Sequence, residues 1–313
     1  MNRILLAFAF LSVTSTLVAQ SSDIESIKRE FIEESQAAND EYRKALANVA
    51  LDYTSKRNVN SRETVETATN FSNSPFQLLK SKFENEDFDT VFMMNPDYTA
   101  SLKKTGEEFI LQDISSLQED NPFANRVGFG DRFCCQFGQF GDYEDDRHIS
   151  QLLESGDLVI TDARRNEDET LSIEFTWNVP EKVEMTGHLT VNPKRYWTIE
   201  KLETSGTVNG RNSTFRLVAK YNHEPVRGVV PPSYHEEETR FIESGVVDHK
   251  KNDYKFYIPN PAPTENEFRV SHYKIPEPEW ASKPRSNRLA IWLFVGVGVL
   301  VSAGLFMRRS SNS

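Results

Sequence analysis

Residues 171–221 decide the fold class, and they read LSIEFTWNVPEKVEMTGHLTVNPKRYWTIEKLETSGTVNGRNSTFRLVAKY. Apolar and polar residues alternate here, or apolar residues run together, in short segments that turn sequences separate. The predicted strands are Leu171 to Trp177, Glu184 to Val191, Tyr196 to Leu202 and Thr214 to Tyr221. The turns at 192–194 and 209–212 contain Asn-Pro and Asn-Gly, and Asn-Gly favours a tight hairpin because both residues tolerate a positive φ.

The same pattern continues on both sides of this stretch. Further predicted strands are Thr90 to Met94, Tyr98 to Leu102, Phe109 to Leu111, Leu158 to Thr161, Glu236 to Ile242, Asp253 to Ile258 and Phe268 to Tyr273. Strands that follow one another without helices between them pair in antiparallel fashion. We therefore predict a mainly β (α+β) fold, with a curved antiparallel sheet or half-barrel in an exported domain of residues 61–273.

Residues 20–60 are predicted to form an amphipathic helix. From Ser22 to Tyr53, apolar residues recur at spacings of three, four and seven, and Glu and Lys occupy the opposite face. One interpretation is that the apolar stripe packs on the β domain. The alternative is a coiled-coil partner helix, although the stripe uses Ala and Tyr rather than repeated Leu.

The first nineteen residues have the three parts of a secretory signal peptide. Arg3 supplies the positive charge, Ile4 to Val13 form an apolar run, and a more polar region leads to a predicted cleavage site after Ala19. The alternative is an uncleaved N-terminal anchor, but the apolar run is short for a membrane span.

A single transmembrane helix is predicted near the C-terminus. Residues 289–307 contain no charge, and at about 1.5 Å per residue they extend roughly 28 Å, enough to cross a bilayer. A Pro-rich linker of residues 274–288 precedes this span, and a cytoplasmic tail of residues 308–313 follows it. We therefore expect a single-pass membrane protein with a periplasmic or extracellular main domain.

The charge of the exported part limits its partners. The chain carries -11, and the exported part about -14, because Arg3, Arg308 and Arg309 lie outside it. Such a surface repels phosphate groups, so the sequence argues against nucleic acid and anionic headgroups as partners.

Cys134 and Cys135 are adjacent and are the only cysteines. They lie in a long Gly-, Phe- and Asp-rich stretch of residues 121–146, which we interpret as a loop that interrupts the sheet. Three states are open for them: a strained vicinal disulfide, two reduced or partly buried residues, and pairing with another chain.

Motifs for catalysis, metals and cofactors are missing from the sequence. It has no HExxH, CxxC, GxSxG, P-loop or dinucleotide-binding pattern, and the acidic run at 142–146 lacks the Gly and Glu of an EF-hand. We therefore predict no cofactor and no metal, and an enzyme ranks third among the functions considered.

Three short sequence segments resemble those of a known group of proteins. They are VFMMNPDYTASL (residues 91–102), VNPKRYWTI (191–199) and FRVSHYKIPEP (268–278). They resemble phrases in exported proteins of planctomycete-type bacteria, whose sheet pattern is similar to the outer-membrane lipoprotein carrier (LolA-like) fold. This resemblance implies a half-barrel over residues 85 to 275 with a helix across its concave side. In the carriers that side is apolar and holds acyl chains.

The C-terminus has a second resemblance. Pro276-Glu277-Pro278, the apolar span and Arg308-Arg309 resemble a PEP-type sorting signal that exosortases process. Here ten residues with three positive charges separate the tripeptide from the span, and that spacing favours a permanent anchor.

These observations predict a membrane-anchored, non-catalytic binding module for an apolar ligand, a lipid, or an envelope protein. The alternative is a structural or interaction scaffold with a filled core. If a ligand binds inside the half-barrel, the candidate apolar ligand face is Phe92, Met94, Phe109, Leu111, Phe175, Trp177, Leu217 and Phe256.

Overall fold

The computed structural model describes residues 2–73, 76–116, 135, 147–221 and 224–281. Thirteen antiparallel strands in these ranges form one sheet, in the order β6-β5-β4-β3-β2-β1-β13-β12-β11-β10-β9-β8-β7. Each half of the sheet is a meander of consecutive hairpins. β1 and β13 join the two halves, while β6 and β7 form the edges of this open sheet.

The strands are β1 (Val49–Val59), β2 (Arg62–Asn73), β3 (Phe76–Phe83), β4 (Asp89–Met94), β5 (Tyr98–Thr105), β6 (Glu108–Ser116), β7 (Leu158–Arg165), β8 (Leu171–Val179), β9 (Val183–Asn192), β10 (Thr198–Val208), β11 (Arg211–Tyr221), β12 (Pro232–Phe241) and β13 (Val247–Tyr257). The helical elements are α1 (Asn2–Leu46), α2 (Ile149–Ser155) and the short 3-10 helices η3 (Pro193–Arg195), η4 (Glu265–Phe268) and η5 (Val270–Tyr273).

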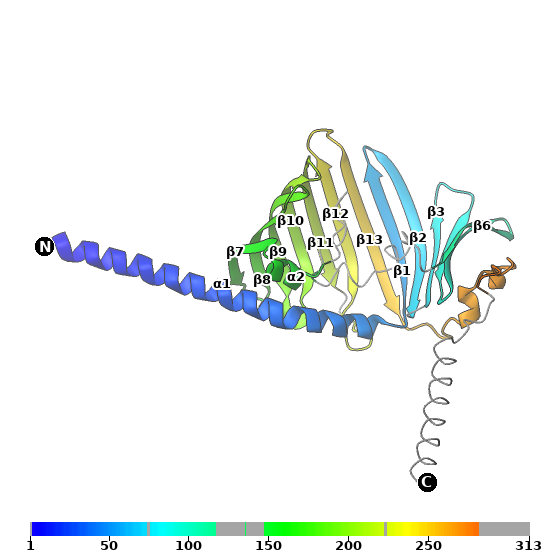
Figure 1. Ribbon diagram of the computed structural model, residues 1–313, viewed down its shortest axis with the longest axis horizontal. Helices are drawn as coiled ribbons and strands as arrows, with labels where there is room; N and C mark the ends of the chain where they lie inside the picture. Colours follow the sequence, from blue (N-terminus) through cyan, green and yellow to red (C-terminus); the bar gives the residue numbers. More distant parts are fainter. Residues whose placement is uncertain (1, 74–75, 117–134, 136–146, 222–223, 282–313) are drawn as a thin grey trace, which may run out of the picture.

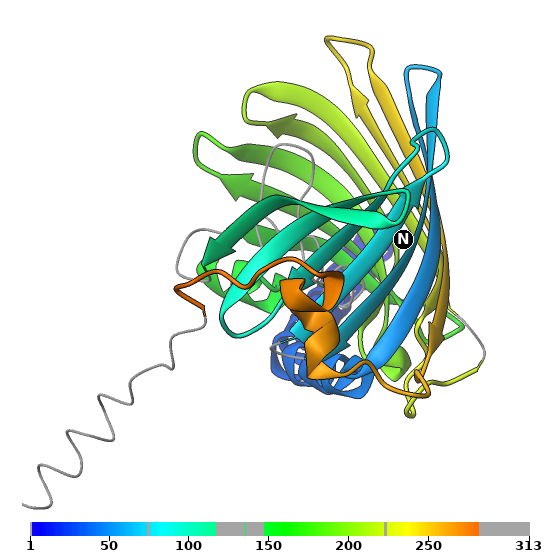
Figure 2. The same ribbon diagram turned by 90° about the vertical axis from the view of Figure 1, so that its right-hand side faces the viewer.

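The expected β-rich fold with a curved antiparallel sheet is confirmed. Figure 2 shows the strands curving through most of a barrel without closing it. The predicted Asn-Gly hairpin is also confirmed, because Asn209 and Gly210 have φ values of 49° and 76° between β10 and β11. Both are the left-handed conformations that a tight turn of this kind requires.

Different helical elements pack on the two faces of the sheet. We call the face that carries Leu51, Phe175 and Leu217 the inner face. α1 packs against this face near β7. Figure 1 shows α1 running along one end of the strands. We call the opposite face, which carries Ala50, Phe71 and Met93, the outer face; η4 and η5 pack on it. Alternation along each strand separates the two sets.

The inner face beneath α1 and α2 is filled. Phe31 of α1 is fully buried and meets Trp197 edge-to-face, with ring centroids 4.9 Å apart. The cavity between the two helices and β7 to β9 has a volume of only about 10 Å³. That is roughly the space of one water molecule, so this half of the sheet has an ordinary packed core.

Two expectations about local structure were wrong. The helix predicted from Ser22 to Tyr53 ends at Leu46, and Val49–Val59 form β1 instead. Asn48 has a φ of 62°, which ends the helix, and β1 then pairs with both β2 and β13. These pairings are long-range, and the local apolar spacing could not reveal them.

The strand predicted from Phe268 to Tyr273 is instead the end of η4 and all of η5. β13, the strand before it, already pairs with β12 and β1, so the chain beyond it meets no adjacent free edge. Phe268, Val270 and Tyr273 are buried on the outer face.

No helix within the described residues is long and apolar enough to cross a membrane. The predicted span at 289–307, its tail, and most of the predicted loop at 121–146 lie outside the described residues. α1 includes residues 2–19 of the predicted signal peptide.

Candidate binding groove on the outer face

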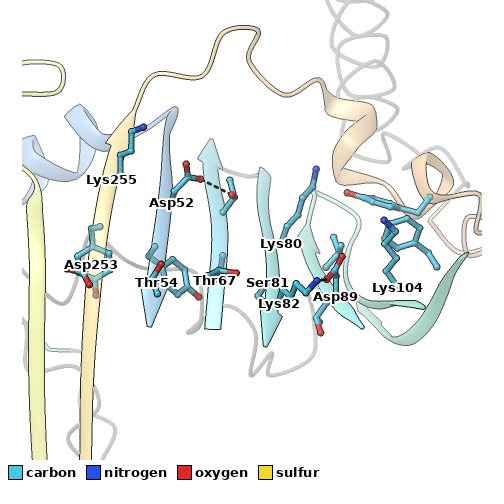
Figure 3. A pocket seen from close by; sticks show the side chains of 18 residues that line it. Asp52, Thr54, Thr67, Lys80, Ser81, Lys82, Asp89, Lys104, Asp253 and Lys255 are labelled. Atoms are coloured by element: carbon cyan, nitrogen blue, oxygen red, sulfur yellow. Dashed lines mark hydrogen bonds and ion pairs between the residues drawn. The ribbon is translucent and has the colours of Figure 1, made fainter. Parts of the chain in front are cut away.

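A groove with a volume of about 750 Å³ lies on the outer face, between β13 and β6 (Figure 3). Small-molecule sites in proteins commonly measure roughly 300–1,000 Å³. The antiparallel registers place the groove's outer-face strand residues in two parallel rows across the strands. The first row is Lys255, Asp52, Thr69, Lys80 and Val91; the second is Asp253, Thr54, Thr67, Lys82, Asp89, Lys104 and Phe109.

The charge of the groove differs from that of the whole chain. Its lining contains four lysines and three aspartates, whereas the chain carries -11. The sequence-based argument against phosphate-bearing partners rested on the total charge. The sheet gathers lysines that are far apart in the sequence, so that argument does not apply to this surface.

Neutral donors hold Asp52 at one end of the groove. Its Oδ1 accepts hydrogen bonds from the hydroxyl of Thr69 at 2.7 Å and from that of Tyr257 at 3.2 Å. Burial and the charge of Asp52 together raise the pKa of Tyr257. Lys255 is the cross-strand neighbour of Asp52 but forms no ion pair with any described residue.

The three groove lysines near β4, which are Lys80, Lys82 and Lys104, differ in their contacts. Lys82 Nζ lies 3.9 Å from Asp89 Oδ1, and Figure 3 shows this pair. The Lys82 side chain is largely exposed and that of Asp89 is partly exposed, so the pair contributes little to stability. Lys80 is exposed and has no ion-pair partner among the described residues. Lys104 lies over the ring of Phe109, with Nζ 5.8 Å from its centroid.

An aromatic wall closes the β6 end of the groove. Phe109 meets Tyr273 of η5 edge-to-face, with centroids 4.7 Å apart. Burial, together with the charge of Glu267, raises the pKa of Tyr273 to about 12. Its hydroxyl donates a 3.4 Å hydrogen bond to the backbone carbonyl of Glu267, which ties the ring to η4.

Residues 265–281, which we call the C-terminal segment, hold this wall in place. Asn95 Nδ2 donates to the carbonyl of Phe268 at 2.8 Å, and the backbone N–H of Val270 donates to the hydroxyl of Tyr98 at 2.9 Å. Phe268 also packs between Phe71 and Phe76.

Glu277 fixes the far end of this segment. It accepts hydrogen bonds from Tyr98 and from the N–H of Ser271, and lies 3.8 Å from Arg269, which also pairs with Asp97. Partial burial alone raises the pKa of Glu277, but these donors outweigh it, and the pKa lies below its ordinary value. The first eight residues of the predicted linker, 274–281, therefore lie against the sheet, with Ile275 and Ala281 packed on its outer core.

The predicted ligand-face residues divide between the two faces. The strand registers place Phe92, Met94, Phe175, Trp177, Leu217 and Phe256 on the inner face. Phe175, Trp177 and Leu217 are buried in the packed core, whereas Phe92, Met94 and Phe256 are half-buried. Phe109 and Leu111 lie on the outer face, and of the eight only Phe109 lines the groove.

The remaining groove residues were not predicted. Asp52, Thr69 and Lys80 belong to β1, β2 and β3, which are strands that sequence analysis did not identify. Their polar alternation was the available signal, but it did not indicate which strands would be neighbours.

Cys135 is a buried free thiol that donates to the carbonyl of Trp197, and burial raises its pKa. This agrees with the reduced, buried alternative for that residue. Cys134 lies outside the described residues, and the vicinal disulfide stays a prediction.

Two histidines, His188 and His235, lie close to polar side chains outside the groove. Ser172 Oγ lies 2.7 Å from His188 Nε2 on the outer face, outside the groove, and Ser172 is buried. His235, fully buried on the inner face, lies 3.0 Å from Glu237 Oε1 and 3.2 Å from the hydroxyl of Tyr254. Among the described residues, no group of three His, Cys, Asp or Glu side chains is arranged to hold a metal ion.

Comparison with known proteins gives similarity of fold alone. No protein-family model matches the chain, and no curated protein matches it. One similar solved structure is a DUF1329 family protein from Desulfovibrio piger, with 8% identity and a TM-score of 0.38, covering 77% of this chain and 99% of that one. Another is an outer membrane lipoprotein-sorting protein domain from Vibrio parahaemolyticus, with 10% identity and a TM-score of 0.39, covering 76% and 97%. No role of a groove residue is inferred from either.

Proposed function

We propose that this protein is a non-catalytic binding module, exported and tethered to a membrane, that holds a lipid in its outer groove. The observation that carries this proposal is the groove itself: a cavity of about 750 Å³ that combines lysines with an aromatic wall. A lipid has a polar headgroup and an apolar body, and such a lining is suited to both.

The C-terminal segment supports a location close to a bilayer. The wall residue Tyr273 belongs to the segment that leads to the predicted span. Because residues 274–281 pack on the sheet, only residues 282–288 separate the domain from that span. Seven extended residues reach at most about 25 Å, so the groove would stay near the membrane surface.

The same observations favour the outer groove over the inner face as the site. A lipid beneath α1 would have to displace Phe31 and Trp177, which are buried in a core with a cavity of only about 10 Å³. The filled core is what the scaffold alternative predicts for that half of the sheet. The two functions therefore differ in whether the outer groove binds anything.

The experiment is to block the groove and measure lipid binding. Thr67 is exposed in the middle of the second row, so Thr67→Trp fills the groove without entering the core. Thr186→Trp is the matched control, because Thr186 is also exposed on the outer face, on β9, away from the groove. The full chain in phosphatidylcholine nanodiscs is titrated with a fluorescent fatty acid, with empty nanodiscs as the blank.

We expect saturable binding that Thr67→Trp weakens at least about tenfold and that Thr186→Trp leaves unchanged. Native mass spectrometry of the protein from its native host should detect a lipid that co-purifies with it. Equal binding by folded Thr67→Trp would remove the groove as the site. A lack of saturable binding in the unaltered chain would leave the scaffold function.

A further inference from the structure

The strand registers around β4 create a position of concentrated positive charge. Lys80 on β3 is opposite Val91 on β4, and Lys104 on β5 is opposite Asp89 on β4. The two lysines therefore flank β4 from both sides, roughly 10 Å apart at the backbone for strands spaced about 4.8 Å. Lysine side chains are long and flexible enough to converge on one group between them.

Few negative charges oppose these lysines. Asp89, on β4, is the cross-strand neighbour of Lys104 and already lies 3.9 Å from Lys82. Glu267 of η4, whose charge acts on Tyr273, is a further carboxylate at this end of the groove. Asp52 lies at the other end of the first row and accepts hydrogen bonds from Thr69 and Tyr257. Lys80 thus has no ion-pair partner among the described residues, and Lys104 contacts a ring rather than a carboxylate. The position over Val91 has unmet positive charge.

Resting on the proposed function, we infer that Lys80 and Lys104 form a subsite for the phosphate of an anionic lipid headgroup. A phosphate over Val91 would accept charge-assisted hydrogen bonds from both ammonium groups, with Tyr273 and Phe109 beside the apolar part of the ligand. Lysine acts here as a point charge, which suits a phosphate that can rotate. Free phosphate has the same chemistry, but the aromatic wall favours the lipid as its source.

The test compares lipids that differ only in the headgroup. The full chain in phosphatidylcholine nanodiscs is titrated calorimetrically with dihexanoyl phosphatidic acid, dihexanoyl phosphatidylcholine and inorganic phosphate. We expect phosphatidic acid to bind at least about tenfold more tightly than phosphatidylcholine, and the difference to shrink as salt is added. If inorganic phosphate binds as tightly as phosphatidic acid, the inference that the bound phosphate belongs to a lipid is wrong.

Two substitutions of opposite sign test the subsite. Lys80→Gln removes an unpaired ammonium and should lower the preference for phosphatidic acid about fivefold or more. Asp89→Asn removes the groove carboxylate next to Lys104 and should raise that preference, a gain that misfolding cannot produce. Lys201→Gln, on the outer face of β10 outside the groove, is the control and should change nothing.

The outcomes separate this inference from the proposed function. If Thr67→Trp weakens both lipids while Lys80→Gln and Asp89→Asn leave their ratio unchanged, the phosphate subsite is wrong and the groove remains the lipid site. If Thr67→Trp has no effect on either lipid, the proposed function fails as well.

Discussion

The hydroxyl of Tyr98 on β5 donates a 2.8 Å hydrogen bond to Oε2 of Glu277, which is 179 residues further along the chain. The same hydroxyl accepts the backbone N–H of Val270 at 2.9 Å. Tyr98 is fully buried, and its pKa is raised to about 12, chiefly by burial. One side chain thus joins the sheet to both parts of the C-terminal segment, which supplies a wall of the groove.

Tyr98→Phe should destabilise the protein by about 1–3 kcal/mol, because it leaves the N–H of Val270 and a carboxylate oxygen of Glu277 without this partner. The free energy of unfolding in urea measures the effect. Tyr257→Phe is the control: its bond to Asp52 is longer, at 3.2 Å, and Tyr257 is half-buried whereas Tyr98 is fully buried. If Tyr257→Phe lowers the free energy of unfolding as much as Tyr98→Phe or more, the importance assigned to Tyr98 is contradicted.

With the full chain in phosphatidylcholine nanodiscs, we expect trypsin to cut within residues 283–288 and to spare Lys274. Lys274 is exposed, but Tyr98, Glu277 and the outer core hold the chain around it in place. Mass spectrometry of the released domain gives its C-terminus, and Tyr98→Phe should speed cleavage after Lys274. Rapid cleavage at Lys274 in the unaltered protein would mean that the segment is not bound to the sheet.

Phe31→Ala should destabilise the protein by about 3–5 kcal/mol, since it removes a fully buried ring that contacts Trp197 at the centre of the inner core. The unfolding free energy of Glu33→Ala, an exposed position on the same helix, provides the comparison and should hardly change. A small loss in Phe31→Ala would indicate that α1 is not part of the folded core, as the coiled-coil interpretation requires.

Stability should fall as the pH drops from about 6.5 to 4, because of His148. Burial, reinforced by the positive charge of Arg43, lowers the pKa of His148 from 6.5 to about 4. In that range the unfolded chain binds a proton that the folded chain does not, so unfolding is favoured as pH falls.

His148→Asn should remove this loss, since asparagine can still cap α2 through the N–H of Ser150. Between pH 7 and 4.5 the unaltered protein should lose about 2 kcal/mol more than His148→Asn. The exposed His272→Asn should behave like the unaltered protein. Parallel pH profiles for all three proteins would show that His148 is protonated equally in both states.

Local sequence predicted most of the strands from Asp89 onward and the turn at Asn209-Gly210, because alternation and left-handed turn residues act within a few positions. It did not predict β1, which lies within the stretch of residues 20–60 predicted as a helix, or β2 and β3, whose outer faces carry Thr67, Thr69, Lys80 and Lys82. It also predicted a strand at Phe268 and Val270, which belong to η4 and η5. Buried apolar residues occur both in strands and in helices that pack on a sheet, so their hydrophobicity did not distinguish the two.

The sequence by itself determined that this protein is β-rich and antiparallel, since each hairpin depends only on neighbouring residues. The tertiary structure alone decided which strands meet at the centre, where Leu51 pairs with Phe256 across the junction of the two meanders. That pairing places Lys255 beside Asp52 and adds β13 to the side of the groove that β1 to β3 form. Pairing between distant strands depends on the register and edges of the whole sheet, so the groove residues share no local pattern.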